Sequence, residues 1–128
     1  MRVLARQLDL MTCPPAVARF ATPGQVFVTA GQLYDVFALA VFEGQPLLQV
    51  VDDLRSPAWL PSWLFDVVDP GLPSDWIGNV FREEPSFVAG PDFVARDQAA
   101  YRRMVELEAH EVDLFWKRVD ASIERPEE

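Results

Sequence analysis

Short apolar segments separated by turn residues make up most of the first half of the chain. Segment 33–42 is rich in aromatic and β-branched residues and ends at Glu43-Gly44-Gln45-Pro46. Glycine adopts the positive φ that tight turns need, so this pattern predicts a hairpin. Four short strands at close spacing favour a small antiparallel barrel or sandwich. The strands predicted here are 33–42, 47–52, 58–60 and 64–68.

The segments on either side of this region show weaker patterns. Residues 2–10 predict a strand, with a short helix as the alternative. Their apolar positions follow neither the alternation of a strand nor the spacing of an amphipathic helix cleanly. Residues 69–73 contain two prolines and a glycine and predict a linker. Ser74 is a suitable N-cap for a short helix to about Phe81. A strand at 86–89, a turn and a further extended piece at 93–95 are expected next.

The clearest periodicity is helical and lies near the C-terminus. Asp97 is a suitable N-cap, and the helix is predicted from about Asp97 to Ala121, with an interruption near Glu108 left open. Apolar side chains recur at helical spacing along one broad face. They are Tyr101, Met104, Val105, Val112, Phe115, Trp116 and Val119.

Length and composition are those of one domain. The chain has 128 residues, half of them apolar, and a single cysteine, Cys13, so no intramolecular disulfide is available. We expect a single α+β domain over 1–128. Its parts are a β-rich barrel (1–69), a linker with a short helix and extended pieces (70–96), and a C-terminal helix or helix pair (97–121). The absence of a signal-like or membrane-spanning apolar run predicts a cytoplasmic protein.

Three stretches within 26–69 resemble a compact SH3-like barrel. Residues 29–36 are similar to a turn that leads into a strand with an aromatic, and residues 49–53 to a strand that runs into an acidic turn. Residues 58–68 are similar to the strand, single-turn helix and strand that close such a barrel. The resemblance implies a small SH3-like antiparallel β-barrel followed by a C-terminal helical segment, and it implies fold rather than ligand. Small cytoplasmic bacterial proteins with such barrels include some that look like immunity or antitoxin partners.

Charge narrows the range of partners. The formal net charge is −9, and between Val26 and Phe81 the single base Arg55 stands against seven acids. Nucleic acids and anionic membranes would be repelled by such a surface, so neither is expected as a partner. An acidic face steers basic proteins toward it, although net charge also serves solubility alone.

Candidate catalytic residues are few. His110 is the single histidine and is expected on the solvent-facing side of the helix. Cys13 precedes two prolines, with no neighbour in sequence to activate its thiol. No phosphate-binding loop, nucleophile elbow or Walker motif is present, and we predict neither a cofactor, a metal nor an enzymatic activity. Asp52 and Asp53, with Asp66 and Asp69 nearby, are the best candidates for a metal-dependent site, but the sequence favours their interpretation as turn-forming aspartates.

Two tryptophans point to protein binding instead. Trp59 and Trp63 flank a tight turn and cannot both point inward easily, and an exposed tryptophan beside acidic residues is typical of a binding hot spot. Ordinary core packing is the alternative for both. We therefore predict a non-enzymatic protein-binding domain, of the acidic inhibitor or immunity type. The partner-binding residues are expected to be Trp59, Trp63, Asp52, Asp53 and Asp66. A homo-oligomeric scaffold and a small metal-dependent enzyme are the alternatives.

Overall fold

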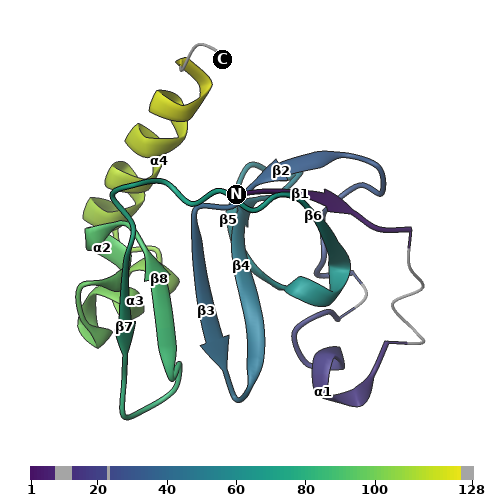
Figure 1. Ribbon diagram of the computed structural model, residues 1–128, viewed down its shortest axis with the longest axis horizontal. Coiled ribbons are helices and arrows are strands. Elements are labelled where there is room, and N and C mark those ends of the chain that lie inside the picture. The colour runs from purple at the N-terminus through teal and green to yellow at the C-terminus, as the bar shows by residue number, and fades with distance from the viewer. Residues whose placement is uncertain (8–12, 23, 125–128) are drawn as a thin grey trace.

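Two antiparallel sheets and a group of helices form the computed structural model, which describes residues 1–7, 13–22 and 24–124 (Figure 1). The smaller sheet has the order β2-β1-β6, with strands Leu33–Asp35, Arg2–Ala5 and Phe65–Asp69. The larger has the order β5-β4-β3-β8-β7, with strands Pro57–Pro61, Gln45–Val51, Ala38–Phe42, Phe87–Gly90 and Ile77–Val80. The helices are α1 (Pro15–Ala18), the 3-10 turn η2 (Ser62–Leu64), α2 (Asp92–Ala95), α3 (Gln98–Val105) and α4 (Ala109–Glu124).

Strand β4 contributes to two cores because both of its faces are covered. Leu48 and Val50 belong to a core cluster shared with the small sheet, whereas Val51 packs against a second cluster that includes the helices. Successive side chains of a strand point to opposite faces, so this one strand supplies both cores. The large sheet is therefore the middle layer, between the small sheet and the helices.

Each core cluster joins segments that are distant in sequence. The first cluster connects Val3 of β1 and Phe65 of β6 with β4 and β5. In the second, Ala38 of β3 and Val88 of β8 lie against Met104 of α3 and Phe115 of α4. Gly90 lies so close to Ala38 that a β-carbon on Gly90 would approach the Ala38 Cβ to 2.9 Å. Small residues at this contact let the two strands and the helices pack closely.

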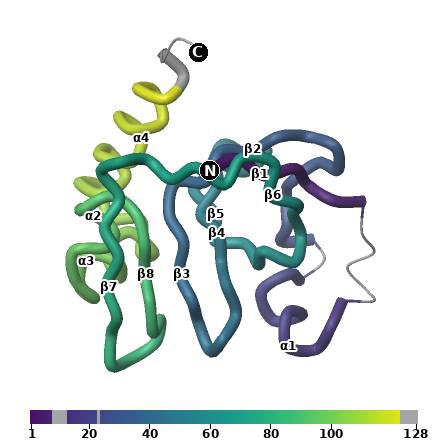
Figure 2. The backbone as a smooth tube through the Cα atoms, in the orientation of Figure 1, coloured from purple at the N-terminus to yellow at the C-terminus, as the bar shows by residue number. Residues whose placement is uncertain are grey.

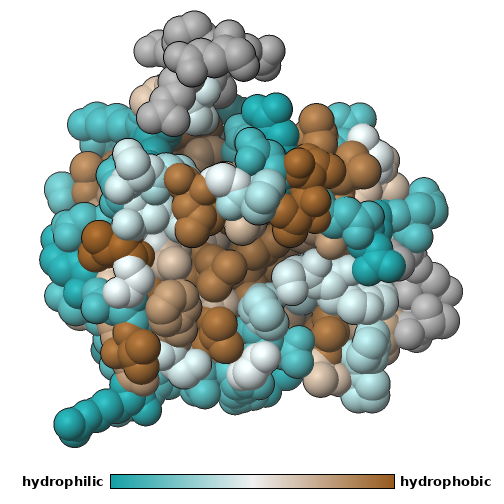
Figure 3. All heavy atoms as spheres, in the orientation of Figure 1, coloured by the Kyte–Doolittle hydropathy of each residue, from teal (hydrophilic) through white to brown (hydrophobic). Residues whose placement is uncertain are grey.

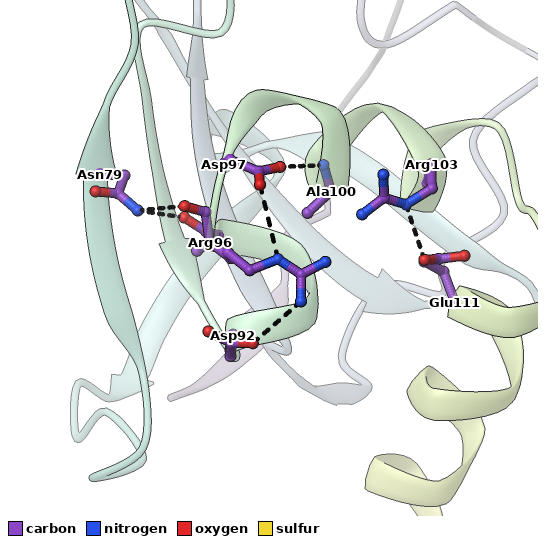
Figure 4. Close-up of polar contacts among 8 residues, drawn as sticks. Asn79, Asp92, Arg96, Asp97, Ala100, Arg103 and Glu111 are labelled. Atoms are coloured by element: carbon purple, nitrogen blue, oxygen red, sulfur yellow. Dashed lines mark hydrogen bonds and ion pairs between the residues drawn. The ribbon is translucent and has the colours of Figure 1, made fainter.

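Helices α2, α3 and α4 form a connected series that packs against the large sheet, and polar contacts link them (Figure 4). The side chain of Asp97 accepts from the backbone N–H of Ala100 at 2.7 Å, which caps α3 as the sequence predicts. Leu107, with φ of 55°, separates α3 from α4. The predicted helix is therefore a pair of helices, interrupted near Glu108. Arg103 then donates to the buried carboxylate of Glu111 at 2.9 Å and joins the two helices.

The α+β class is confirmed, but the described residues form two separate sheets and no closed barrel. Pro57–Asp69 matches its expected strand, single-turn helix and strand, as β5, η2 and β6. The hairpin turn at Glu43-Gly44 is also present, with φ of 49° and 81°. The single strand expected over 33–42 is divided into β2 and β3, which belong to different sheets. The expected strand at 2–10 is β1 over Arg2–Ala5, while residues 8–12 lie outside the described part.

Two predictions in the second half are wrong. The helix expected over 74–81 is absent, because Ile77–Val80 pairs with β8 as strand β7. The extended piece expected at 93–95 is helix α2, in which Val94 and Ala95 donate to the carbonyl of Pro91. Strand β8 ends at Gly90, and Pro91 starts a helical turn that buries Val94 and Ala95 against the second core cluster. Backbone hydrogen bonds within this turn satisfy the polar groups of the segment.

The connection from β6 to β7 carries the chain from the small sheet across to the far edge of the large one (Figure 2). The carboxylate of Asp75 in this connection accepts hydrogen bonds from Nη1 and Nη2 of Arg118 on α4, at 2.5 and 2.7 Å. Within the described residues, no helix combines the length and the apolar character needed to cross a bilayer.

Candidate functional site

A pocket of about 520 Å³ lies between β2, the turn that joins β4 to β5, and α4. Its apolar wall includes Phe37, Val51 and Val119. These residues also belong to or pack against the second core cluster, between the large sheet and the helices, which we call the helix-side cluster. Its polar residues include Tyr34 and Asp53, contributed by strand β2 and by the β4–β5 turn. The pocket thus has an apolar part that is rigidly packed and a polar part at the ends of two strands.

Asp53 is held by two neutral hydroxyl groups. Thr29 donates through Oγ1 to one carboxylate oxygen at 2.6 Å, and Tyr34 donates through its hydroxyl to the other at 2.7 Å. The Tyr34 hydroxyl in turn accepts from the backbone N–H of Thr29 at 2.8 Å. No basic group of the described part of the chain lies within 4 Å of this carboxylate. Among the described residues, neutral hydroxyl donors therefore orient this negative charge.

Burial is the largest influence and raises the pKa of the Tyr34 hydroxyl. The backbone N–H of Thr29 lowers this pKa, the hydrogen bond and charge of Asp53 raise it again, and the Thr29 side chain lowers it slightly. Tyr34 consequently remains a neutral hydrogen-bond donor at physiological pH. This keeps the Asp53 carboxylate in place, because an ionised phenol would repel it.

Asp52 has a different role from its neighbour. Its side chain is buried, and one carboxylate oxygen accepts from the backbone N–H groups of Leu54 and Ser56, each at 3.0 Å. These bonds close the turn between β4 and β5, as expected of an Asx-type turn. Asp52 and Asp53 thus use their carboxylates on different partners and do not form a pair.

Arg55 supplies a positive charge at the pocket. Its backbone has φ of 60°, and its guanidinium lies over the ring of Trp116 on α4, 5.6 Å from the centroid. This stacking joins the turn to α4. Three aspartates, Asp35, Asp52 and Asp53, and one arginine, Arg55, are among the residues that line the pocket.

The outer face of the small sheet continues from the pocket. Strand register places Leu33 and Asp66 on either side of Leu4, and Asp35 and Asp69 on either side of Arg2. We call these six residues the outer face. Figure 3 shows apolar and hydrophilic atoms side by side over the region of β1, β2 and β6.

The charges of the outer face are only partly balanced. Arg2 donates to Asp35 at 3.1 Å, and Arg6 lies 3.8 Å from Asp66, all with exposed side chains. Asp69 accepts from the backbone of Gly71 at 2.9 Å. Leu33, opposite Leu4 on edge strand β2, is 53% exposed. Exposed ion pairs contribute little to stability, so the face combines negative charge with an accessible apolar side chain.

Trp59 and Trp63 do not meet. Trp59 packs against the helix-side cluster, with its ring 5.3 Å from that of Tyr101, whereas Trp63 packs against the small-sheet cluster. Both are half-buried, on opposite sides of the large sheet, and neither lines the pocket. Of the residues predicted for partner binding, the structure brings only Asp52 and Asp53 into the pocket, while Asp66 lies on the outer face.

Thr29, Leu33 and Tyr34 were missed as site residues in the sequence. Tyr34 could have been suspected, because a tyrosine hydroxyl that becomes buried usually finds a partner. The partner itself lies 19 residues away, so only the fold shows it.

Metal binding gains no support from the part of the chain that the structure covers, where no three histidine, cysteine or carboxylate side chains are grouped to hold an ion. His110 is exposed, as expected. Comparisons with protein-family models, curated proteins and solved structures find no match.

Proposed function

We propose that the protein is a non-enzymatic protein-binding domain that engages a basic partner, as an acidic inhibitor of the immunity type would. The observation that supports this most directly is the outer face, where Leu33 is exposed on the same side of the small sheet as the carboxylates of Asp35, Asp66 and Asp69. Charged groups of one sign speed the encounter with an oppositely charged protein, and an apolar side chain among them contributes to the contact after docking.

The SH3-like resemblance belongs to the same proposal. It is supported locally by the series β5, η2 and β6, which follows the hairpin of β3 and β4. We propose that this arrangement is a rigid scaffold. Its small sheet presents the outer face through backbone pairing on both sides of β1.

Association kinetics test the proposal. The tagged chain is first used to recover its partner from the native lysate, and the association rate with the purified partner is then measured at low and high salt. We expect Asp66→Lys to lower the association rate at low salt by about tenfold, within the range over which charge steering alters encounter rates. The difference should shrink at high salt, because exposed charges are screened.

Glu83→Lys is the matched control. It makes the same change of charge on an exposed residue between β7 and β8, away from the small sheet. Equal association rates for Asp66→Lys and Glu83→Lys would contradict a role for the outer face. Charge reversal at Asp52 is unsuitable, because it would remove the two turn-closing bonds of a buried side chain.

Strand β7 supports a second candidate, a homo-oligomeric scaffold. It is an edge of the large sheet, Val80 is 81% exposed, and Ile77–Val80 contains neither charge nor proline. An unprotected edge of this kind can pair with another strand. Sedimentation at several concentrations tests it: a dimer that Val80→Lys converts to monomer would support the scaffold, and a monomer at all concentrations would exclude it.

A further inference from the structure

We propose that the pocket between β2, the β4–β5 turn and α4 receives a lysine or arginine side chain of the basic partner. This inference rests on the proposed function and deepens it, because it names the chemical group that the partner inserts. Three features of the pocket support it: an oriented carboxylate, an apolar wall, and a shared border with the outer face.

Asp53 is prepared to receive a cation. Thr29 and Tyr34 each donate one hydroxyl hydrogen bond to a different carboxylate oxygen, at 2.6 and 2.7 Å. Each oxygen therefore keeps acceptor capacity for a further N–H group. Since both donors are neutral, the charge of Asp53 is available to an incoming ammonium or guanidinium, and little conformational freedom is lost when it binds.

The apolar wall matches the other half of such a side chain. Lysine and arginine carry a charged head on a stem of methylene groups, and they commonly lay this stem along apolar surface. Val51, which is half-buried, and the accessible edges of the buried Phe37 and Val119 provide a small surface of this kind in the same pocket as Asp53. An acidic side chain would be repelled by Asp53, and a short polar one would leave the wall uncovered.

Strand β2 makes the pocket continuous with the outer face. Leu33 and Asp35 line the pocket and also belong to the outer face. A partner seated on that face would therefore have the pocket at the border of its contact. The volume of about 520 Å³ is ample for one extended side chain.

Arg55 gives the proposal a test in the opposite direction. Its guanidinium stacks on Trp116 and places a positive charge at the same pocket. The positive charge of Arg55 opposes the binding of a cationic side chain from the partner. Removing it should strengthen binding, which a misfolded variant would not do.

The experiment uses butylguanidinium as the probe and neutral butylurea, of nearly the same shape, as the matched ligand. Both are titrated into the full chain while backbone amide signals are followed by NMR. We expect a dissociation constant on the order of millimolar for butylguanidinium, with shifts at Tyr34, Val51 and Asp53. Binding of butylurea should be about tenfold weaker, since one charge-assisted hydrogen bond is of that order.

Three variants sharpen the result. Asp53→Asn should weaken butylguanidinium binding about tenfold, and Arg55→Gln should strengthen it about threefold, consistent with removing one nearby like charge. Glu83→Gln, an exposed carboxylate away from the pocket, should leave it unchanged. Equal binding of the two probes, or an Arg55→Gln variant that binds no better than the unsubstituted chain, would overturn the proposal.

Failure of this inference differs visibly from failure of the proposed function. If the probe does not bind while Asp66→Lys slows partner association, the pocket assignment is wrong and the docking face stands. The opposite result is that the probe binds, while Asp66→Lys and Glu83→Lys associate with the partner at the same rate. The pocket would then bind a cation, but the claim that a partner docked on the outer face supplies this cation would be wrong.

Discussion

Gln49 offers the sharpest test of how the central layer is built. Its side chain is fully buried in β4, and neither amide atom has a hydrogen-bond partner among the described residues. Its cross-strand neighbours are Ala38 and Trp59, which lie on the helix side of the sheet. We expect Gln49→Met to stabilise the protein, because methionine keeps an unbranched side chain of similar volume and removes the buried amide.

The expected stability change of Gln49→Met follows from the buried amide, which has no hydrogen-bond partner among the described residues. A buried amide without partners costs about 1–3 kcal/mol in proteins, whereas a volume-conserving apolar exchange costs less than about 1.5 kcal/mol. The net gain in the free energy of unfolding should therefore be about 1–2 kcal/mol. For a chain of this length, that corresponds to a rise in Tm of roughly 3–10 °C.

Urea unfolding followed by circular dichroism measures this difference, with Gln25→Met as the control at an exposed turn residue. The control should change the free energy of unfolding by less than about 0.5 kcal/mol. Gln49→Glu should destabilise by about 3 kcal/mol or more, since it buries an unpaired charge. The reasoning is refuted if Gln49→Met destabilises by about 1 kcal/mol or more while the control is neutral, because the amide would then be hydrogen-bonded in solution.

Three further perturbations test the fold. Burial raises the pKa of Tyr101 from 10.0 to about 12, so its contribution to stability is complete below pH 10 and is lost as pH rises from 10 to 12. Tyr101→Phe should remove up to about 2–3 kcal/mol of this alkaline loss, measured by urea unfolding across that range; an unchanged pH dependence would contradict it. Gly90→Ala should cost about 1–3 kcal/mol in unfolding free energy because of the 2.9 Å approach to Ala38, and a neutral result would show that the strands separate easily. Asp97→Ala should lower thermal stability by about 1 kcal/mol through loss of the α3 cap, whereas unaltered melting would mean that water replaces it.

Local chemistry was sufficient for several elements. The turn at Glu43-Gly44 was predictable because glycine has access to positive φ, and the α3 cap because an aspartate side chain can accept from the first free N–H groups of a helix. The strand, 3-10 turn and strand over 57–69 likewise follow short local signals. In these segments the interaction that decides the structure lies within a few residues.

The misassigned segments depend on distant partners. Ile77–Val80 has the composition of neither a strong helix nor a strong strand, and it becomes a strand because β8 presents an open side for pairing. The segment after Gly90 becomes helical because a helical turn buries Val94 and Ala95 against residues distant in sequence, such as Met104 and Phe115. Propensity is a weak influence when backbone pairing of a whole segment is available.

The candidate site likewise has features that the sequence shows and features that depend on the fold. Acidity between Val26 and Phe81 was visible in the sequence, and it pointed to Asp52, Asp53 and Asp66. Adjacent in sequence, Asp52 and Asp53 received different roles because one faces its own turn and the other faces Tyr34. Trp59 and Trp63 were separated because β5 and η2 direct them to opposite sides of the large sheet.

The sequence by itself determined the α+β class, the main turns, the C-terminal helices and the excess of negative charge, since these depend on backbone preferences and composition. Only the tertiary structure decided that there are two sheets and where β7 pairs. It also decided that Asp53, Tyr34 and Thr29 meet beside an apolar wall. The reason is physical: strand pairing and pocket formation join groups far apart along the chain, and the free energy of those contacts exists only once the layers have assembled.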